Sequence, residues 1–152
     1  MKTLFAFCLW LASAAALAQI DQAKPVDSHQ TFGDYTVHYS VFNSTFITPE
    51  VARIHKLARA KNRVLVNVSL TQKREGASSL GLPARVSGTA TNLIQQQRPL
   101  EFITVSEGEA TYYLASLRHT NEEVINFVVN LQPEGSSETF TVRFTRTLHV
   151  EP

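Results

Sequence analysis

The chain has 152 residues and carries 14 Lys and Arg against 13 Asp and Glu, which leaves it almost neutral. This balance argues against nucleic acid or an anionic membrane as a bulk electrostatic partner. The length suits one domain with an ordinary core and is short for two.

The first eighteen residues have the three parts of a secretory signal peptide. Lys2 provides the basic start, residues 4–17 form an apolar core, and Ala16-Leu17-Ala18 supplies small residues before a cut. The apolar run is shorter than the ~20 residues that a membrane span needs. We therefore expect cleavage after Ala18, export to the periplasm and no transmembrane anchor after cleavage. The single cysteine, Cys8, is lost with the signal peptide, so the mature chain has no disulfides or thiolate metal sites.

Residues 19–30 are polar, contain Pro25 and show no hydrophobic period. We expect a flexible N-terminal leader there, followed by a single domain over residues 31–152. Apolar and polar residues alternate from Tyr35 to Val41, the period of a strand with one buried face. The alternation slips next, which predicts a bulge or a strand end near Phe42-Asn43.

A short helix is predicted to follow this strand. Thr48 can cap it with its hydroxyl group, Pro49 suits the first helical position, and Glu50 faces the positive end of the helix dipole. The apolar residues that follow at helical spacing are Val51, Ile54, Leu57 and Ala58. We expect this stripe to lie on a sheet and the helix to end between Arg59 and Asn62.

Strand periodicity resumes at residues 64–70 and returns at 84–91, 124–131 and 140–150, whereas residues 73–82 predict a loop. The strand over 84–91 has small residues on its inward face, which predicts the close approach of a bulky neighbour. Residues 100–105 and 110–117 flank Ser106-Glu107-Gly108-Glu109 and predict an antiparallel hairpin. About seven strands indicate an all-β fold: an antiparallel sandwich of immunoglobulin-like or fibronectin-like type, with one short helix inserted between the first two main strands.

Motifs for catalysis, metals and cofactors are missing from the sequence. Gly135-Ser136-Ser137 has no nucleophile-elbow frame, and no glycine-rich phosphate motif is present. The histidines of the mature chain, at positions 29, 38, 55, 119 and 149, have no short spacing that would place two on one face. His38 and His149 could meet if their strands were neighbours. We therefore predict no catalytic residues, no metal site and no cofactor.

A basic strip is the densest charged feature. It comprises Arg53, Lys56, Arg59, Lys61 and Arg63, with His55 among them, and no acidic residue lies between Val51 and Lys73. Such a strip is either a solvated face or a site for an anionic group bound by charge-assisted hydrogen bonds. The candidate ligand-binding residues are Asn43, Glu50, Arg53, His55, Arg59, Lys61 and Arg63.

Six segments follow one another along the chain: 42–46 (FNSTF), 48–52 (TPEVA), 61–63 (KNR), 67–69 (NVS), 88–93 (GTATNL) and 112–113 (YY). Together they resemble a family of small exported proteobacterial proteins known as domain of unknown function 4426. The resemblance spans nearly the whole mature chain. It implies a periplasmic domain like a β-sandwich, without an established activity and without catalytic or ligand residues to carry over.

The leading hypothesis from the sequence is a periplasmic, non-catalytic binding or protein-interaction module. It would use a groove around residues 48–63 or an exposed sheet edge, and its partner would be a periplasmic protein or a small anionic ligand. One alternative is an assembly or structural factor for an envelope complex. Another is a small hydrolase or lyase that uses Glu50, His55 or His38 as general acid and base, which requires these side chains to converge in one pocket.

Overall fold

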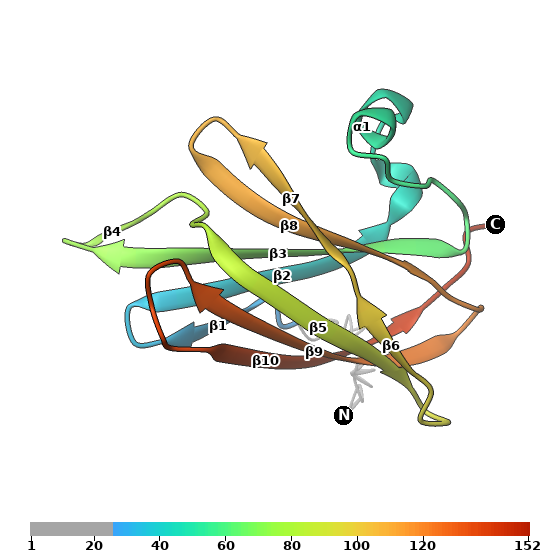
Figure 1. Ribbon diagram of the computed structural model, residues 1–152. Helices are drawn as coiled ribbons and strands as arrows, with labels where there is room; N and C mark the ends of the chain where they lie inside the picture. The colour runs from blue at the N-terminus through green and yellow to red at the C-terminus, as the bar shows by residue number, and fades with distance from the viewer. Residues whose placement is uncertain (1–25) are drawn as a thin grey trace, which may run out of the picture.

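Two antiparallel sheets pack face to face in the computed structural model, which describes residues 26–152 (Figure 1). The larger sheet has the order β1 (His29–Phe32), β2 (Tyr35–Asn43), β3 (Arg63–Arg74), β8 (Ala110–Arg118) and β7 (Phe102–Glu107), and β4 (Ala77–Ser78) pairs with one end of β3. The smaller sheet has the order β10 (Phe140–Leu148), β9 (Glu123–Pro133), β5 (Ala84–Asn92) and β6 (Gln97–Leu100). The predicted all-β sandwich is confirmed. No helix within this part of the chain is long and apolar enough to span a bilayer.

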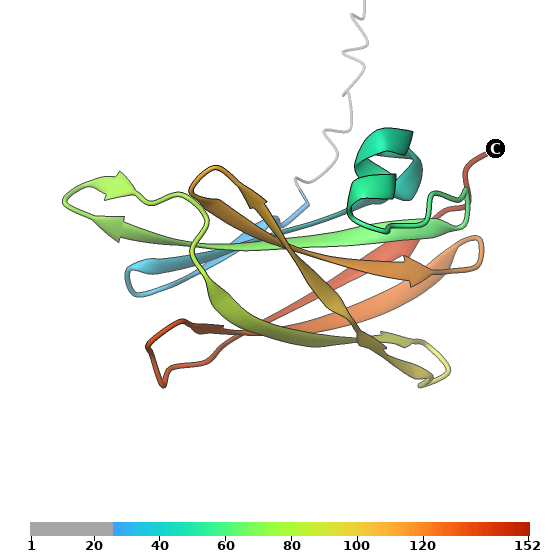
Figure 2. The same ribbon diagram turned by 45° about the horizontal axis from the view of Figure 1, so that its top comes forward.

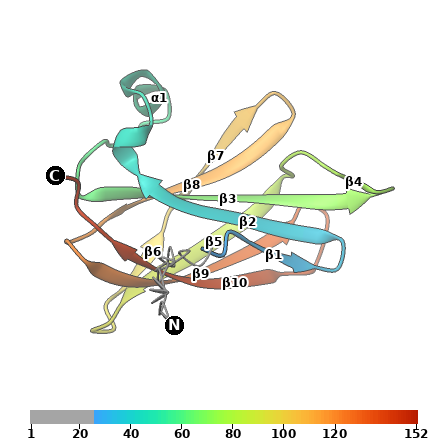
Figure 3. The ribbon, with the colours of Figure 1, turned by 180° about the vertical axis from the view of Figure 1, so that it is seen from behind.

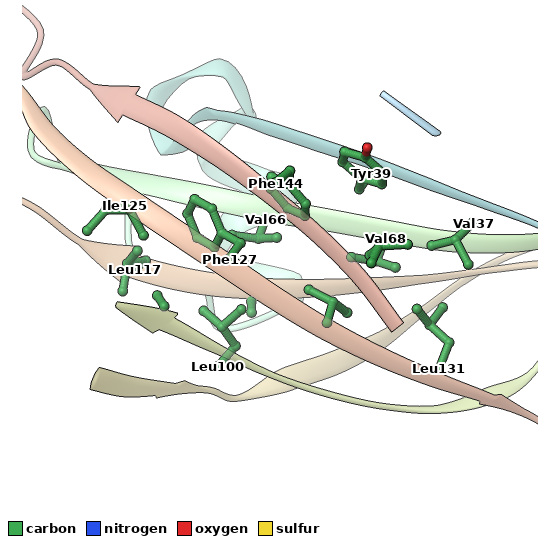
Figure 4. Close-up of a cluster of buried hydrophobic side chains, with 14 of the residues drawn as sticks. Val37, Tyr39, Val66, Val68, Leu100, Leu117, Ile125, Phe127, Leu131 and Phe144 are labelled. Atoms are coloured by element: carbon green, nitrogen blue, oxygen red, sulfur yellow. The ribbon is translucent and has the colours of Figure 1, made fainter. Parts of the chain in front are cut away.

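The core lies between the two sheets and is filled by every second residue of the central strands. Ile125, Phe127, Val129 and Leu131 of β9 are buried, as are the alternating valines of β3. Figure 4 shows these side chains converging from both layers. The ring of Phe144 on β10 stacks on Phe127 at a centroid distance of 5.0 Å and on Tyr39 of β2 at 4.3 Å. This stack therefore joins the smaller sheet to the larger one.

The chain switches sheets between β6 and β7, where the sequence predicted one strand over residues 100–105. Leu100 ends β6 in the smaller sheet, and Phe102 begins β7 in the larger sheet. A strand that changes layers must bend, and here Glu101 makes the bend. The bulky neighbour expected beside the small residues of β5 is Leu100. A Cβ added at Gly88 would lie 3.3 Å from the Leu100 side chain and 2.7 Å from the carbonyl oxygen of Val128.

Two further segments differ from expectation. β3 runs on to Arg74 and forms a small hairpin with β4 where a loop over residues 73–82 was predicted. β1 begins at His29, inside the stretch assigned to a polar leader, and pairs with β2 across the turn at Gly33-Asp34. The predicted hairpin of β7 and β8 is confirmed, and its turn residue Gly108 has a φ of +59°.

The connection from β2 to β3 contains a short 3-10 helix, η1 (Ser44–Phe46), and a single α-helix, α1 (Pro49–Ile54). The predicted helix start is confirmed, because the Thr48 hydroxyl accepts a hydrogen bond from the Val51 amide at 3.3 Å. The helix ends at Ile54, earlier than expected, and Lys56 adopts a φ of +53°. The predicted apolar stripe does not lie on a sheet: Val51 and Ile54 are exposed, and Ala52 is the buried residue of α1.

A polar network secures one end of the sandwich. The Glu123 carboxylate lies 3.2 Å from the Arg98 guanidinium and accepts hydrogen bonds from the Thr120 amide at 2.8 Å and the Asn92 side chain at 3.4 Å. Burial alone would raise the pKa of Glu123, but these hydrogen bonds and the nearby Arg98 charge outweigh it and lower the pKa. The folded state therefore favours the ionised form of Glu123.

Because the pKa of Glu123 is lower in the folded chain than in the unfolded one, its contribution to stability is present above the unfolded pKa and is lost as the pH falls through the folded pKa. Glu123→Gln should lower the free energy of unfolding at neutral pH by about 1 to 2 kcal/mol. The difference in the free energy of unfolding between wild type and variant should become smaller below pH ~4. Urea titrations across pH measure this, with the exposed Glu138→Gln as the matched control. A gap that does not change with pH contradicts the prediction.

Candidate functional site

Residues 44–62, here called the insertion, stand out from the end of the larger sheet. β2 and β3 pair directly up to Asn43 and Val64, so the insertion leaves and re-enters the sheet at neighbouring strand ends. Figures 1 and 2 show η1 and α1 projecting from this end, near the C-terminus of the chain. The insertion was predicted to present whatever the protein recognises, and it is not absorbed into the core.

A buried serine fixes the two ends of the insertion to each other. Ser44 is fully buried, and its hydroxyl group donates to the Ala60 carbonyl at 3.1 Å and accepts from the Ala60 amide at 2.9 Å. The Ala52 carbonyl of α1 accepts a hydrogen bond from the Leu57 amide at 2.8 Å. These bonds give the insertion a defined shape although its helix is only one to two turns long.

The C-terminal tail also holds the insertion. The Thr45 hydroxyl donates to the Glu151 carboxylate at 2.5 Å, and the Glu151 amide donates to the Lys61 carbonyl at 3.1 Å. The Lys61 ammonium group donates to the Pro152 carbonyl at 2.6 Å. The base of the insertion is therefore tied to a segment about ninety residues further along the chain.

These contacts divide the predicted basic strip into two groups. Lys61 binds the tail, Arg59 donates to the Thr45 carbonyl at 3.1 Å, and Arg63 donates to the Ser116 hydroxyl at 2.8 Å. Their cations serve the fold of the insertion. Arg53 and Lys56 are exposed and make no side-chain hydrogen bond or ion pair within residues 26–152. Only these two cations of the strip are free to meet a partner.

The other predicted site residues are spread around the insertion. Glu50 lies exposed in the first turn of α1, and His55 is its half-buried C-cap residue. Asn43 ends β2 and lines a hollow of about 200 Å³ together with Arg146 and His149. The seven candidates therefore do not form one pocket.

Large apolar side chains are exposed on the same element as the free cations. Phe46 is 73% exposed, Ile54 59% and Val51 39%. Val51 and Ile54 are three residues apart in α1 and so share one side of it. We call Phe46, Val51, Arg53, Ile54 and Lys56 the insertion surface. Sequence reasoning assigned Val51 and Ile54 to the core because their spacing matches a buried stripe, and it gave no signal for Phe46.

The enzymatic alternative needs Glu50, His55 and His38 in one pocket. His38 lies in the middle of β2, and the strand from there to Asn43 spans about 16 Å. Four hollows in residues 26–152 are lined by none of these three side chains. The two neighbouring hollows of about 520 and 380 Å³ are lined around Pro83 and the turn at Pro133-Glu134-Gly135, at the opposite end of the sandwich.

Two histidines meet on the larger sheet, but not the two that sequence reasoning named. His38 lies on β2, whose neighbours are β1 and β3, whereas His149 follows the end of β10 in the other sheet. His38 faces His29 instead, with ring centroids 6.1 Å apart. Burial and then the nearby His29 lower the pKa of His38. The missed signal is the turn Gly33-Asp34, since counting back four residues along a hairpin from this turn places His29 opposite His38.

Comparisons with known proteins agree with this architecture. A family model described as a domain of unknown function (DUF4426) matches residues 29–151. The solved structure of a DUF4426 family protein from Pseudomonas aeruginosa is 34% identical, with a TM-score of 0.72, and the match covers 82% of this chain and 95% of that chain. No curated protein matches the chain.

FetP from uropathogenic Escherichia coli has a similar fold. One FetP structure is 13% identical with a TM-score of 0.62, covering 85% of this chain and 97% of that chain. A copper-bound FetP variant is 12% identical with a TM-score of 0.63, and the match covers 84% of this chain and 97% of that chain. At these identities the likeness shows the fold alone.

The Ser44 hydroxyl is the contact that closes the insertion, so Ser44→Ala should loosen it. Removing the hydroxyl leaves the Ala60 amide without its partner, at an expected cost of about 1 to 3 kcal/mol, whereas the Ala60 carbonyl keeps its hydrogen bond from the Arg63 amide at 3.2 Å. Chemical denaturation measures the loss, and limited trypsin digestion should cut faster near Lys56 and Arg59. Ser137→Ala, in an exposed turn, is the matched control. Equal stability and equal cleavage of the two variants would show that the hydroxyl does not hold the insertion.

Proposed function

Since the chain belongs to the DUF4426 family, a domain of unknown function, we propose a function from the geometry of this chain. The protein is a non-catalytic periplasmic interaction module that binds a partner protein through the insertion surface. The observation that carries this proposal is the exposure of Phe46 and Ile54 beside the free cations Arg53 and Lys56 on a projecting, well-anchored element.

Large apolar side chains are costly to expose to water. Exposed apolar patches that polar groups surround mark interaction sites. Burying a phenylalanine ring in a partner supplies the central contact of a typical interface. The two cations would meet acidic groups at the rim, where charge guides the approach and orientation of the partner. The partner surface would therefore combine an apolar recess with acidic residues.

A partner protein fits this site better than a small anionic ligand does. Small molecules bind in concave sites that enclose most of their surface. The insertion projects outward, and the same four hollows in residues 26–152 are lined by neither Arg53 nor Lys56. A flat or recessed protein surface could instead cover Phe46 and both cations at once.

Strand addition at β10 is a second candidate, because a hollow of about 470 Å³ lies beside this strand. Val26, Asp27 and Tyr39 line the hollow together with residues 143–146 of β10. β10 pairs only with β9 among the strands described, so no strand of residues 26–152 occupies its other edge, which could accept an added strand. Two arginines, Arg143 and Arg146, lie along this edge and would oppose uncontrolled pairing between copies of the chain.

Photo-crosslinking in living cells tests the main proposal. A benzophenone amino acid in place of Phe46 should give one discrete protein adduct. Reversing the charges with Arg53→Glu and Lys56→Glu should reduce this adduct at least tenfold, because the acidic rim would then repel the site. The same probe at Ile94, which is 74% exposed on the β5–β6 turn, is the matched control and should give no such adduct.

Four outcomes would overturn the proposal. An adduct at Phe46 that survives charge reversal would exclude a role for the cations, and the same adduct from Ile94 would show nonspecific capture. Binding of the purified chain to anionic lipid vesicles, lost on charge reversal and without a protein adduct, would replace the partner protein with a membrane surface. A discrete adduct from a probe at Thr145 alone would favour the β10 edge.

The periplasmic assignment rests on the signal peptide over residues 1–18, which lies outside the described residues. Expression of the full chain in a Gram-negative host should yield a periplasmic product that begins at Gln19. Intact-mass measurement of that product identifies its first residue. A product that retains Met1 to Ala18, or one confined to the cytoplasm, contradicts the prediction.

A further inference from the structure

The first strand pair of the larger sheet places two imidazole rings side by side. His29 of β1 and His38 of β2 are direct partners in the antiparallel register. The Tyr39 amide donates to the Ser28 carbonyl at 2.8 Å, which makes Ser28 and Tyr39 a hydrogen-bonded pair. Hydrogen-bonded and non-hydrogen-bonded pairs alternate along an antiparallel ladder, so the adjacent histidines form a non-hydrogen-bonded pair. Side chains in such pairs lie closest of all cross-strand neighbours and share one face of the sheet.

Both rings are on the outer face, away from the core. Val37 and Tyr39, which flank His38, point into the core, whereas His38 and His29 are exposed. The ring centroids are 6.1 Å apart, with an interplanar angle of 33°. Two nitrogens that share one metal ion at ~2.0 Å each lie about 3 to 4 Å apart. To bind one ion, the exposed His29 ring would turn toward His38 until one nitrogen of each ring reaches that separation.

A hydroxyl group on the next strand orients the second ring. Nε2 of His38 lies 3.0 Å from Oγ1 of Thr71 on β3. When Nε2–H donates to this hydroxyl, the lone pair of Nδ1 is left free. Ligating histidines are commonly fixed in this way, through a hydrogen bond of the ring nitrogen that does not bind the metal. Thr71 would therefore act as a positioning residue that orients the His38 ring.

We propose that His29 and His38 form a two-histidine chelating site for a divalent late first-row transition-metal ion, with Cu(II) bound most tightly. Neutral imidazole suits copper, nickel and zinc, and affinity in this series peaks at Cu(II). Within residues 26–152 no third histidine, cysteine or carboxylate joins the pair, so water completes the coordination shell.

A bound ion would hold the first strand, β1, against β2. β1 has four residues, and β2 is its only partner strand among those described (Figure 3). A metal ion that bridges β1 and β2 binds the paired state and not the separated one, so it stabilises the pairing by mass action. Metal binding would therefore control how firmly the segment before β2 is held against the sheet.

Calorimetric titration of the mature chain with Cu(II) and, separately, Zn(II) tests the site. We expect one ion per chain and a metal-dependent rise in the melting temperature. Either His29→Gln or His38→Gln should weaken binding at least tenfold and abolish the rise, because one imidazole cannot chelate. The matched controls His55→Gln and His149→Gln should bind as the wild type does. Melting curves without metal check that each variant folds.

Electron paramagnetic resonance of the Cu(II)-loaded wild type gives a measurement that needs no variant. Two imidazole nitrogens should contribute to the hyperfine pattern at one equivalent of copper. A pattern with one imidazole nitrogen would overturn the proposal. Binding by His29→Gln and His38→Gln within twofold of wild type would also overturn it, since the ion would then sit elsewhere.

Discussion

The stack of Tyr39, Phe144 and Phe127 is the contact on which the rest of the molecule depends. It runs from β2 in one sheet to β10 and β9 in the other, with centroid distances of 4.3 and 5.0 Å. Phe144 and Phe127 are also direct partners across β10 and β9, so a register error of one residue would put the two rings on opposite faces of the sheet. Once these rings face inward, each alternate residue must face outward, which fixes the polar and charged positions of the outer surfaces.

The two outer surfaces differ in the groups that they leave free. On the smaller sheet, Thr141 and Thr145 donate to the facing Asn130 and Asn126 at 2.7 and 2.6 Å, so these polar side chains satisfy one another. The larger sheet carries the insertion at one end and the histidine pair at its β1 edge. The insertion surface and the histidine pair therefore both belong to the larger sheet, whereas the edge of β10 belongs to the smaller one.

The fold was predictable because the alternation of apolar and polar residues along a strand is a local signal. Burial of one face of the strand produces that alternation. The start of α1 was predictable for the same reason, since Thr48, Pro49 and Glu50 act within one turn. Burial of Val51 and Ile54 was predicted wrongly, because spacing says which residues share a side of a helix and not whether anything covers that side. The split of the basic strip depends on partners in the distant C-terminal tail, which no local pattern reveals.

The insertion replaces the turn of what is otherwise a hairpin between β2 and β3, whose nine paired positions hold their own register. Closing a longer connection between strand ends that are already adjacent adds little entropy cost, because that cost grows only with the logarithm of length. A chain built this way can exchange its recognition element for one of another length or chemistry while the scaffold stays the same. Specificity and stability would then be free to evolve separately.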